Sequence, residues 1–436
     1  MTQPLRPCCA VAVTVFASFC AAGATICVNP EGTSGCVNAI GAAVLMANPN
    51  DTIQVAPGVY KETVTITKPL SLLGANRNSV IINANGRANG IYIDGLDNAG
   101  LANVTISGFT VENANFEGIL ATNTTALLIK NNIVSGNDKG LNVSAATCAG
   151  QPAFETSEGD DCGEGIHLMG VDHSTVSGNQ VQSNAGGILI TDETAPNHDN
   201  LIIGNTVVDN PYDCGITLAS HPQAMPLTAP QGVYHITVSG NTSMYNGVVN
   251  QSGAGVGIFT PSPGTANYGN LVINNELIGN GLPGVALHSH APNQKLADNI
   301  IVGNHIANNG PDDSTTAPTG IAIMGLLEPA GTPLPVTGTV ISGNVIEQES
   351  IDVAVASTAA ATVQLNSLGG GAGVIGVQNL GTGTINATEN WWGCANGPSD
   401  AACTTVNGTG ISFAPWLSNA PGSGNSGPGI IPRGHD

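Results

Sequence analysis

The feature that most constrains this chain is a short unit that recurs along most of its length. In residues 175–184, two short runs centred on Val are separated by Gly-Asn, and a second Asn ends the unit. The spacing of the first Asn varies from 26 residues (205 − 179) to 47 residues (179 − 132), so each unit has a fixed core and connecting loops of free length. This first Asn recurs at Asn132, Asn179, Asn205, Asn241, Asn275, Asn304 and Asn344.

A second Asn series and a Gly-led apolar run repeat together with this unit. The Gly-led run precedes most units, as in residues 165–168, 187–190 and 215–218. A strand of three residues cannot hold a hairpin alone, but it can pair in parallel with the same strand of the next turn, about 4.8 Å away. Apolar side chains then stack inside, and the Asn bends form hydrogen-bonded ladders. The pattern therefore predicts an all-β solenoid. The second series is Asn137, Asn184, Asn210, Asn246, Asn280 and Asn309.

With these repeats, residues 52–392 resemble the pectin-lyase-like superfamily and are similar to the periplasmic β-helix accessory proteins of nitrous-oxide reductase maturation. The resemblance implies a single-stranded right-handed parallel β-helix with a short N-terminal capping helix. Residues 33–47 carry apolar residues at helical spacing and predict that helix, with a Ser or Thr as its N-cap. Residues 389–416 resemble the motif that closes the C-terminal end of such proteins.

The chain divides into four predicted segments. Residues 1–24 indicate a secretory signal peptide, because Arg6 precedes an apolar run that ends in Ala-Gly-Ala. We expect residues 25–51 to form the N-terminal cap with its helix, residues 52–416 the β-helix, and residues 417–436 a disordered tail rich in Gly, Pro and Ser. No second apolar run approaches the roughly 18 residues of a membrane span. The sequence thus predicts a secreted or periplasmic protein with no transmembrane segment.

Cysteine spacing agrees with an oxidising compartment. Six cysteines form three local pairs by spacing, which predicts disulfides within Cys27/Cys36, Cys148/Cys162 and Cys394/Cys403. Cys214 is left over. It is interpreted as a small apolar residue beside a tight turn, with a reactive thiol or a metal ligand as the alternative.

The charge balance limits the partners of this chain. Nine Lys and Arg residues stand against 30 Asp and Glu residues, a formal net charge of −21. This balance argues against nucleic acid and against anionic membrane surfaces as partners. It also disfavours a bare polyanionic substrate unless metal ions bridge the like charges. The sequence does not indicate an oligomeric state.

Alignment of the Gly-led strands places residues from different turns in shared columns. One column holds Thr191, Ala219 and His288. We expect insertions at one register to build a lateral face from residues 191–199, 219–234 and 289–298. The following two columns, and loops next to them, hold the site candidates Asp192, Glu193, Tyr212, Asp213, His221 and His290, with His198 and Asp199 nearby.

Two kinds of chemistry suit such a group of imidazoles and carboxylates. General acid–base catalysis near neutral pH would use His221, His288, His290, Tyr212 and Asp213. A divalent metal such as Ca²⁺, Zn²⁺ or Cu²⁺ would be held by Asp192, Glu193, His221 and His290. The alternative is that these are polar residues on solvated loops, and His167, His173, His235 and His305 are interpreted as single outward or bend residues.

The enzymes of the superfamily guide the functional interpretation. The Gly-His-Gly and Arg-Ile-Lys motifs of polygalacturonase-like members and the Asp-Pro-His motif of mannuronan epimerases are absent, and Lys295 and Arg433 are the only basic residues after Lys139. The sequence therefore favours an exported protein that binds or processes a polysaccharide or cell-surface glycan on the lateral face, as a divergent lyase, epimerase or glycoside hydrolase. A non-catalytic surface or adhesion β-helix and a periplasmic metal-handling β-helix are the alternatives.

Overall fold

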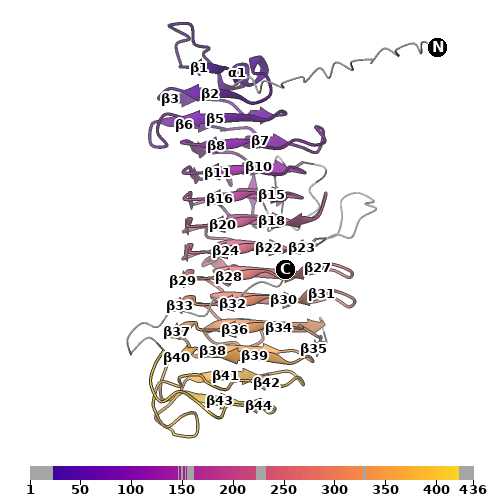
Figure 1. Ribbon diagram of the computed structural model, residues 1–436, viewed down its shortest axis with the longest axis vertical. Helices are drawn as coiled ribbons and strands as arrows, with labels where there is room; N and C mark the ends of the chain where they lie inside the picture. Colours follow the sequence, from indigo (N-terminus) through magenta and orange to yellow (C-terminus); the bar gives the residue numbers. More distant parts are fainter. Residues whose placement is uncertain are drawn as a thin grey trace, which may run out of the picture.

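The computed structural model describes residues 23–421, except residues 146, 149–150, 153, 155–161, 222–231 and 328–329. The chain winds into an elongated right-handed parallel β-helix, and each strand pairs with the equivalent strand of the next turn (Figure 1). The predicted fold class is confirmed. The signal peptide (except residues 23–24) and most of the predicted tail lie outside the described residues.

Three long sheets, here called A, B and C, form the faces of the described solenoid, and they contain 14, 11 and 13 strands. Sheet A contains β1 (Thr25–Val28), β2 (Asp51–Val55), β5 (Leu70–Gly74), β8 (Thr105–Ser107), β11 (Leu128–Lys130), β16 (Thr175–Ser177), β20 (Leu201–Ile203), β24 (Thr237–Ser239), β28 (Leu271–Ile273), β32 (Ile300–Val302), β36 (Val340–Ser342), β39 (Ala361–Gln364), β42 (Ile385–Asn386) and β44 (Ile411–Ser412). Sheet B contains β3 (Gly58–Tyr60), β6 (Val80–Asn83), β9 (Thr110–Glu112), β12 (Ile133–Ser135), β17 (Gln180–Gln182), β21 (Thr206–Val208), β25 (Thr242–Met244), β29 (Glu276–Ile278), β33 (His305–Ala307), β37 (Val345–Glu347) and β40 (Ser367–Leu368). Sheet C contains β4 (Val64–Ile66), β7 (Asn89–Asp94), β10 (Glu117–Thr122), β15 (Glu164–Met169), β18 (Gly186–Thr191), β22 (Ile216–Ala219), β26 (Val256–Thr260), β30 (Val285–Ser289), β34 (Thr319–Leu327) with β35 (Thr332–Pro333), β38 (Ile351–Ala356), β41 (Ile375–Asn379) and β43 (Thr405–Asn407).

The interior follows from the repeat. In β16 the middle residue, Val176, is buried, and it lies in register with Ile129 of the preceding turn and Ile202 of the next. Like side chains therefore stack on like along the axis, and a single apolar core runs from Val28 to Cys403. Burial on this scale stabilises the stack by about 25 cal/mol per Å² of apolar surface.

The Asn series form two buried ladders along the bends, as predicted. The Oδ1 atom of Asn205 accepts hydrogen bonds from the backbone N–H and the Nδ2 of Asn179, both at 3.0 Å. The same pattern repeats from turn to turn, and the first ladder continues past Asn344 to Asn366 and Asn390. Each rung forms hydrogen bonds to polar groups that water cannot reach. Burying the polar groups of the bends therefore costs little free energy.

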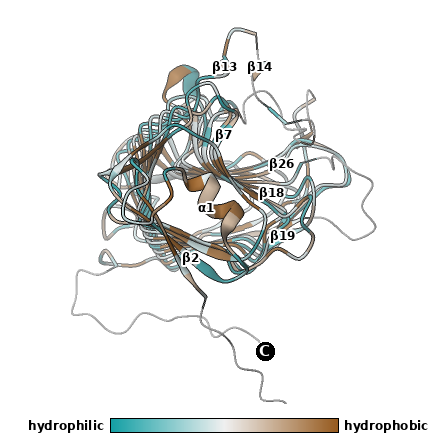
Figure 2. Ribbon diagram, turned by 90° about the horizontal axis from the view of Figure 1, so that it is seen from above, coloured by the Kyte–Doolittle hydropathy of each residue, from teal (hydrophilic) through white to brown (hydrophobic). Residues whose placement is uncertain are grey.

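The N-terminal helix is shorter than predicted and is capped differently. Helix α1 (Ile40–Met46) lies across the end of the solenoid (Figure 2). Its N-cap is Ala39, not a Ser or Thr, and Ala39 makes no side-chain cap hydrogen bond. The carboxylate of Glu62 instead accepts from the backbone N–H groups of Ile40 and Gly41, both at 2.8 Å. A residue of the first turn thus supplies the cap that the local sequence lacks.

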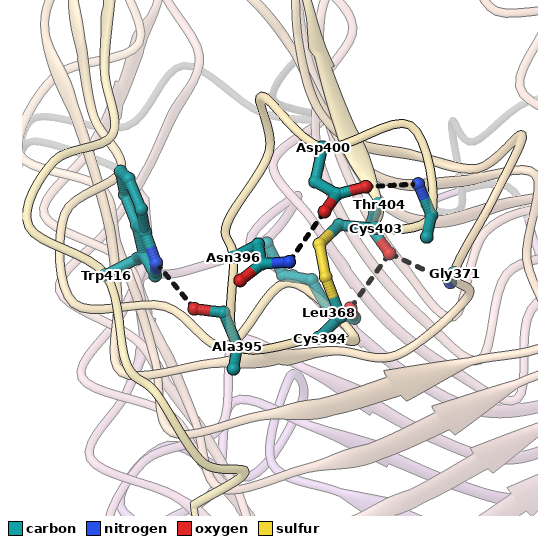
Figure 3. The surroundings of a disulfide bond; sticks show 10 residues. Leu368, Gly371, Cys394, Ala395, Asn396, Asp400, Cys403, Thr404 and Trp416 are labelled. Carbon is teal, nitrogen blue, oxygen red and sulfur yellow. Dashed lines mark hydrogen bonds between the residues drawn. A yellow bond between two sulfur atoms is a disulfide. The ribbon is translucent and has the colours of Figure 1, made fainter.

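The C-terminal end is closed by the predicted motif. Trp392 is fully buried in the core and belongs to the same apolar cluster as Cys403. The Cys394–Cys403 disulfide lies in the closing loop (Figure 3). Thr404 Oγ1 donates to the carbonyl of Leu368 at 3.1 Å, and Trp416 Nε1 donates to the carbonyl of Ala395 at 3.1 Å (Figure 3). These bonds anchor the closing loop to the last turns.

The other predicted disulfides, Cys27–Cys36 and Cys148–Cys162, also form. Cys214 is a buried free thiol. Burial raises its pKa well above the usual value, which disfavours the reactive thiolate, so Cys214 packs as a small apolar residue. No helix among the described residues is long and apolar enough to cross a membrane.

Several of the lateral insertions end in a fourth, short sheet, here called D. Sheet D contains β19 (Asn197–His198), β23 (Val233–Tyr234), β27 (Ala266–Tyr268) and β31 (Lys295–Ala297). The insertions thus return to one register whatever their length, which builds the lateral face predicted from the sequence. Outside the stack, β13 (Leu141–Asn142) and β14 (Thr147–Cys148) form a small hairpin, and a 3-10 helix spans Val249–Gln251.

Candidate functional site

The predicted column at the end of the sheet C strands is confirmed. Thr191 lies in register with Ala219, Ala219 with Phe259, and Phe259 with His288. Phe259 is the member that the sequence alignment missed. The column brings residues almost 100 positions apart onto one outer flank.

A cavity of about 270 Å³ opens next to this column. Its walls carry two aromatic rings, three imidazoles, a carboxylate and hydroxyl groups, a mixture typical of sites that bind polar organic molecules. All five residues predicted for catalysis line it. The cavity is lined by Tyr212, Asp213, Thr217, Ala219, His221, Ser252, Phe259, Pro261, His288 and His290.

Two of the imidazoles form a relay with a buried carboxylate. His288 Nε2 lies 2.7 Å from Oδ2 of Asp312, and His288 Nδ1 lies 3.2 Å from Nε2 of His290. Burial opposes ionisation of Asp312, but its bonds to His288 and to the N–H of Ser314 prevail and lower its pKa below the usual value. An ionised Asp312 orients His288 and stabilises a proton taken up by the imidazole pair. Asp312 was not predicted, because it lies in a loop one turn further along.

Asp192 lies behind the cavity rather than in it. Its carboxylate accepts from Ser220 Oγ and from the backbone N–H of His221, both at 2.9 Å. The side chain is fully buried, and burial raises its pKa to about 7. Asp192 therefore positions the loop that carries His221.

A buried polar chain extends from His221 along the outer face of sheet C. His221 Nδ1 lies 3.4 Å from Glu193, whose other oxygen accepts from Thr191 Oγ1 at 2.9 Å. Thr191 in turn meets His167 Nε2 at 2.9 Å, and His167 Nδ1 lies 3.5 Å from Glu117. Burial lowers the pKa of His167 to about 4, so its imidazole is neutral at neutral pH and acts through hydrogen bonds.

The predicted metal ligands do not form a group of three or more among the described residues, although His221 Nδ1 lies 3.4 Å from Glu193. Among the described residues, three or more candidate ligand atoms lie within 4.8 Å of one another in two groups, and neither group contains Asp192, Glu193, His221 or His290. The first group is His173, His198 and Asp199; the second is Cys394, Asp400 and Cys403. The cysteines of the second group form a disulfide and are not available as ligands.

The sequence did contain a signal for two members of the first group, His173 and Asp199, and for His235 beside them. His173, Asp199 and His235 each stand six residues before an Asn of the first ladder (179 − 173, 205 − 199 and 241 − 235). A constant offset from a ladder position means a shared column, so these side chains had to be neighbours. His173 and His235 were interpreted singly, and Asp199 was placed near the lateral site candidates, because the columns were aligned on the Gly-led strands and not on the Asn bends.

The fold and the lateral cavity together define a parallel β-helix protein of the pectin-lyase-like class. Its sequence matches the family model described as "Periplasmic copper-binding protein (NosD)" over residues 29–223 and 147–280, which together span more than half of the chain. The chain belongs to this NosD family. No curated protein matches the sequence.

Solved structures share the fold at low sequence identity. The Dettilon tailspike protein (gp208) is 13% identical, with a TM-score of 0.53 over 89% of this chain and 68% of that chain. The DFA-IIIase of Arthrobacter chlorophenolicus A6 without its lid, in complex with GF2, is 12% identical, with a TM-score of 0.53 over 91% of this chain and 100% of that chain. The Geobacillus virus E2 ORF18 protein is 12% identical with a TM-score of 0.47, and the match covers 83% of this chain and 61% of that chain, less than two thirds of its length. Likenesses at this level show the fold alone.

Proposed function

We propose that this protein is exported and that it binds a neutral glycan in the lateral cavity and transfers protons on it. The observation that carries the proposal is the Asp312–His288–His290 relay at the wall of a cavity that also presents Phe259. Aromatic faces pack against the apolar faces of sugar rings, and imidazoles exchange protons near neutral pH. Tyr212, Asp213 and His221 complete the hydrogen-bonding wall.

The charge of the cavity selects the substrate class. None of the described residues that line it is Lys or Arg, and the sequence of the neighbouring segment 222–231 contains neither. Lys295, the nearest candidate in sequence, lies over the ring of Tyr268 on sheet D, 3.3 Å from its centre. A uronate carboxylate would therefore meet Asp213 without a neutralising cation, which favours an uncharged polysaccharide or cell-surface glycan.

The location of the protein follows from its chemistry. Three disulfides need an oxidising compartment, and the sequence begins with the features of a signal peptide. The family description names the periplasm. We therefore assign the mature protein to the periplasm or the exterior of the cell.

The experiment is an assay of the oxidised mature chain against a panel of neutral and acidic polysaccharides. New reducing ends from a neutral glycan would support hydrolysis, and absorbance of an unsaturated uronate from an acidic one would overturn the substrate class. His288→Ala and Asp312→Asn should each lower the rate by about 10²-fold or more. The control is His305→Ala, an exposed imidazole beside Glu347 on sheet B, which should leave the rate unchanged.

Two other results would contradict proton transfer. Retention of a glycan without any product would identify a binding protein of the surface type. Rates that are insensitive to both His288→Ala and Asp312→Asn would remove the relay from the mechanism.

Metal handling is the second candidate function, and a separate observation favours it. The family to which the chain belongs is described as copper-binding, and His173, His198 and Asp199 offer ligand atoms within 4.8 Å of one another. Imidazole and carboxylate donors fit Cu²⁺ or Zn²⁺ better than Ca²⁺. This group lies apart from the residues that line the cavity.

A further inference from the structure

The corner between sheets D and A carries a column of ionisable side chains. His173, Asp199 and His235 occupy equivalent positions in three successive turns, each just before a strand of sheet A. Each has a left-handed backbone, with φ of 48°, 55° and 54°. Hydrogen bonds from His173 N to the carbonyl of His198 and from Asp199 N to that of Tyr234 tie the turns together at 3.2 and 3.3 Å. The corner is thus a rigid backbone that presents side chains at fixed spacing.

Asp199 is the centre of this group. Its Oδ2 lies 2.8 Å from His198 Nδ1 and 3.9 Å from His173 Nε2, and its Oδ1 lies 3.4 Å from His235 Nδ1. Three imidazoles therefore surround one carboxylate. The side chains of His173 and His235 are 62% and 57% exposed, so an ion from solution can reach the group.

Neighbouring side chains already orient two of the rings. His173 Nδ1 lies 2.8 Å from Asp172 Oδ1, which also accepts a hydrogen bond from Thr125 Oγ1. This carboxylate holds the proton on Nδ1, and the Nε2 lone pair of His173 is left to face Asp199. The ring of His198 is stacked on Tyr234 with a centre-to-centre distance of 4.8 Å and an interplanar angle of 11°. A carboxylate behind a ligating histidine is the usual second shell of zinc and copper sites.

We infer that His173, His198 and Asp199, with His235 as a fourth ligand, form a surface site for one borderline dication, Zn²⁺ or Cu²⁺. Two or three nitrogen donors and one oxygen donor match the preferences of these ions and not those of Ca²⁺ or Mg²⁺. The ion binds in the space between the imidazole nitrogens and the Asp199 carboxylate. An exposed site on a rigid corner releases and accepts its ion readily, as transfer between proteins requires. This inference rests on metal handling, the second candidate function, and is independent of the glycan cavity.

The test measures metal binding by the oxidised mature chain in the absence of any glycan. Equilibrium dialysis and titration calorimetry with Zn²⁺ or Cu²⁺ alone should give one ion per chain. His198→Ala and Asp199→Asn should each weaken binding by more than tenfold, and Asp172→Asn by about 10- to 100-fold through the second shell. The matched control is His305→Ala, which should leave the affinity unchanged, and circular dichroism checks that each variant folds.

The results distinguish the proposed site at His173, His198 and Asp199 from metal handling in general. Electron paramagnetic resonance of the Cu²⁺ complex should show coupling to at least two imidazole nitrogens, and its loss in the His173→Ala/His198→Ala double variant supports the site. Binding that survives this double variant would leave metal handling intact and overturn the site. Failure to bind either ion would overturn both.

Discussion

At the scale of single residues, the Asn ladders concentrate the buried polar groups of the molecule. Asn241 accepts from the N–H and the Nδ2 of Asn205, and its own Nδ2 donates to the carbonyl of Ile202 and to Asn275, all at 2.9–3.0 Å. One side chain thus joins several turns of the solenoid.

We expect Asn241→Ala to lower the free energy of unfolding by at least about 2 kcal/mol. The substitution leaves buried donors and an acceptor without hydrogen-bond partners, and they cannot reach water. Asn142 is exposed and takes no part in a ladder, so Asn142→Ala is the control and should change stability by less than about 0.5 kcal/mol. Denaturant unfolding followed by circular dichroism measures both. Equal effects of the two substitutions would show that the ladder does not stabilise the fold.

The second ladder ends in an acid. Glu349 Oε1 accepts from the N–H and the Nδ2 of Asn309, both at 3.0 Å, and burial raises the pKa of Glu349 from its ordinary 4.5 to about 7. The folded protein therefore holds a proton that the unfolded chain releases between these two pH values. The contribution of Glu349 to stability is fully present below about pH 4.5 and is lost as the pH rises through about 7.

Glu349→Gln should remove this contribution, about 1–3 kcal/mol between pH 4.5 and 7, because an amide keeps the acceptor and carries no charge. Thermal unfolding across that range measures it. Glu347→Gln, at a side chain that is 47% exposed, should leave the pH dependence as it is in the wild type. Buried Asp192 contributes to the pH dependence in both variants, so some dependence should remain. If stability changed with pH in Glu349→Gln as steeply as in the wild type, the assignment of this contribution to Glu349 would be wrong.

At the scale of elements, helix α1 depends on a residue outside itself. The Glu62 carboxylate accepts from the first two N–H groups of α1, and no side chain at the N-cap does so. The helix covers the first turn, so its loss would expose core residues such as Ile40 and Val44.

Glu62→Ala should destabilise the N-terminal cap by about 0.5–2 kcal/mol, in the range of a lost helix cap. Hydrogen exchange should accelerate in α1 and β2 and stay unchanged near β30. Glu276→Ala, at an exposed position of β29, is the control. Unchanged exchange in α1 would mean that packing alone holds the helix.

The sequence predicted the repeat, the ladders and the cysteine pairs, because each of these depends on residue spacing that can be read directly from the sequence. It did not predict the cap at Glu62 or the partner at Asp312, since both lie in neighbouring turns at no fixed offset. The cavity residues were found by aligning strands. Of the predicted metal ligands, His221 lies beside Glu193, but the four do not form one group, because Asp192 turns toward the backbone of His221. Side-chain direction within a loop is set by hydrogen bonds that register alone does not reveal.

At the scale of the whole molecule, stability is propagated from turn to turn. Each strand of the three long sheets pairs with the equivalent strands of the adjacent turns along the rod in Figure 1, so damage at one end should spread gradually. The fully buried Trp392 closes the C-terminal end.

Trp392→Ala should cost about 3–5 kcal/mol locally. Limited proteolysis should then remove turns progressively from the C-terminal end, while the turns around β10 and β15 remain protected. Mass spectrometry of the fragments measures this order. Simultaneous cleavage at both ends would contradict propagation between neighbouring turns.

The ladders also bear on how the protein ages chemically. Asn246, Asn280 and Asn309 each precede glycine, the pair most prone to deamidation, because the glycine nitrogen attacks the side-chain carbonyl. Here each of those glycine N–H groups is held by the carbonyl of the preceding rung at 2.8 Å, as in Gly281 N to Asn246 O. Cyclisation must wait until a rung opens, and each event then leaves a permanent negative charge inside the solenoid. The rate at which rungs open therefore limits how fast these three residues deamidate.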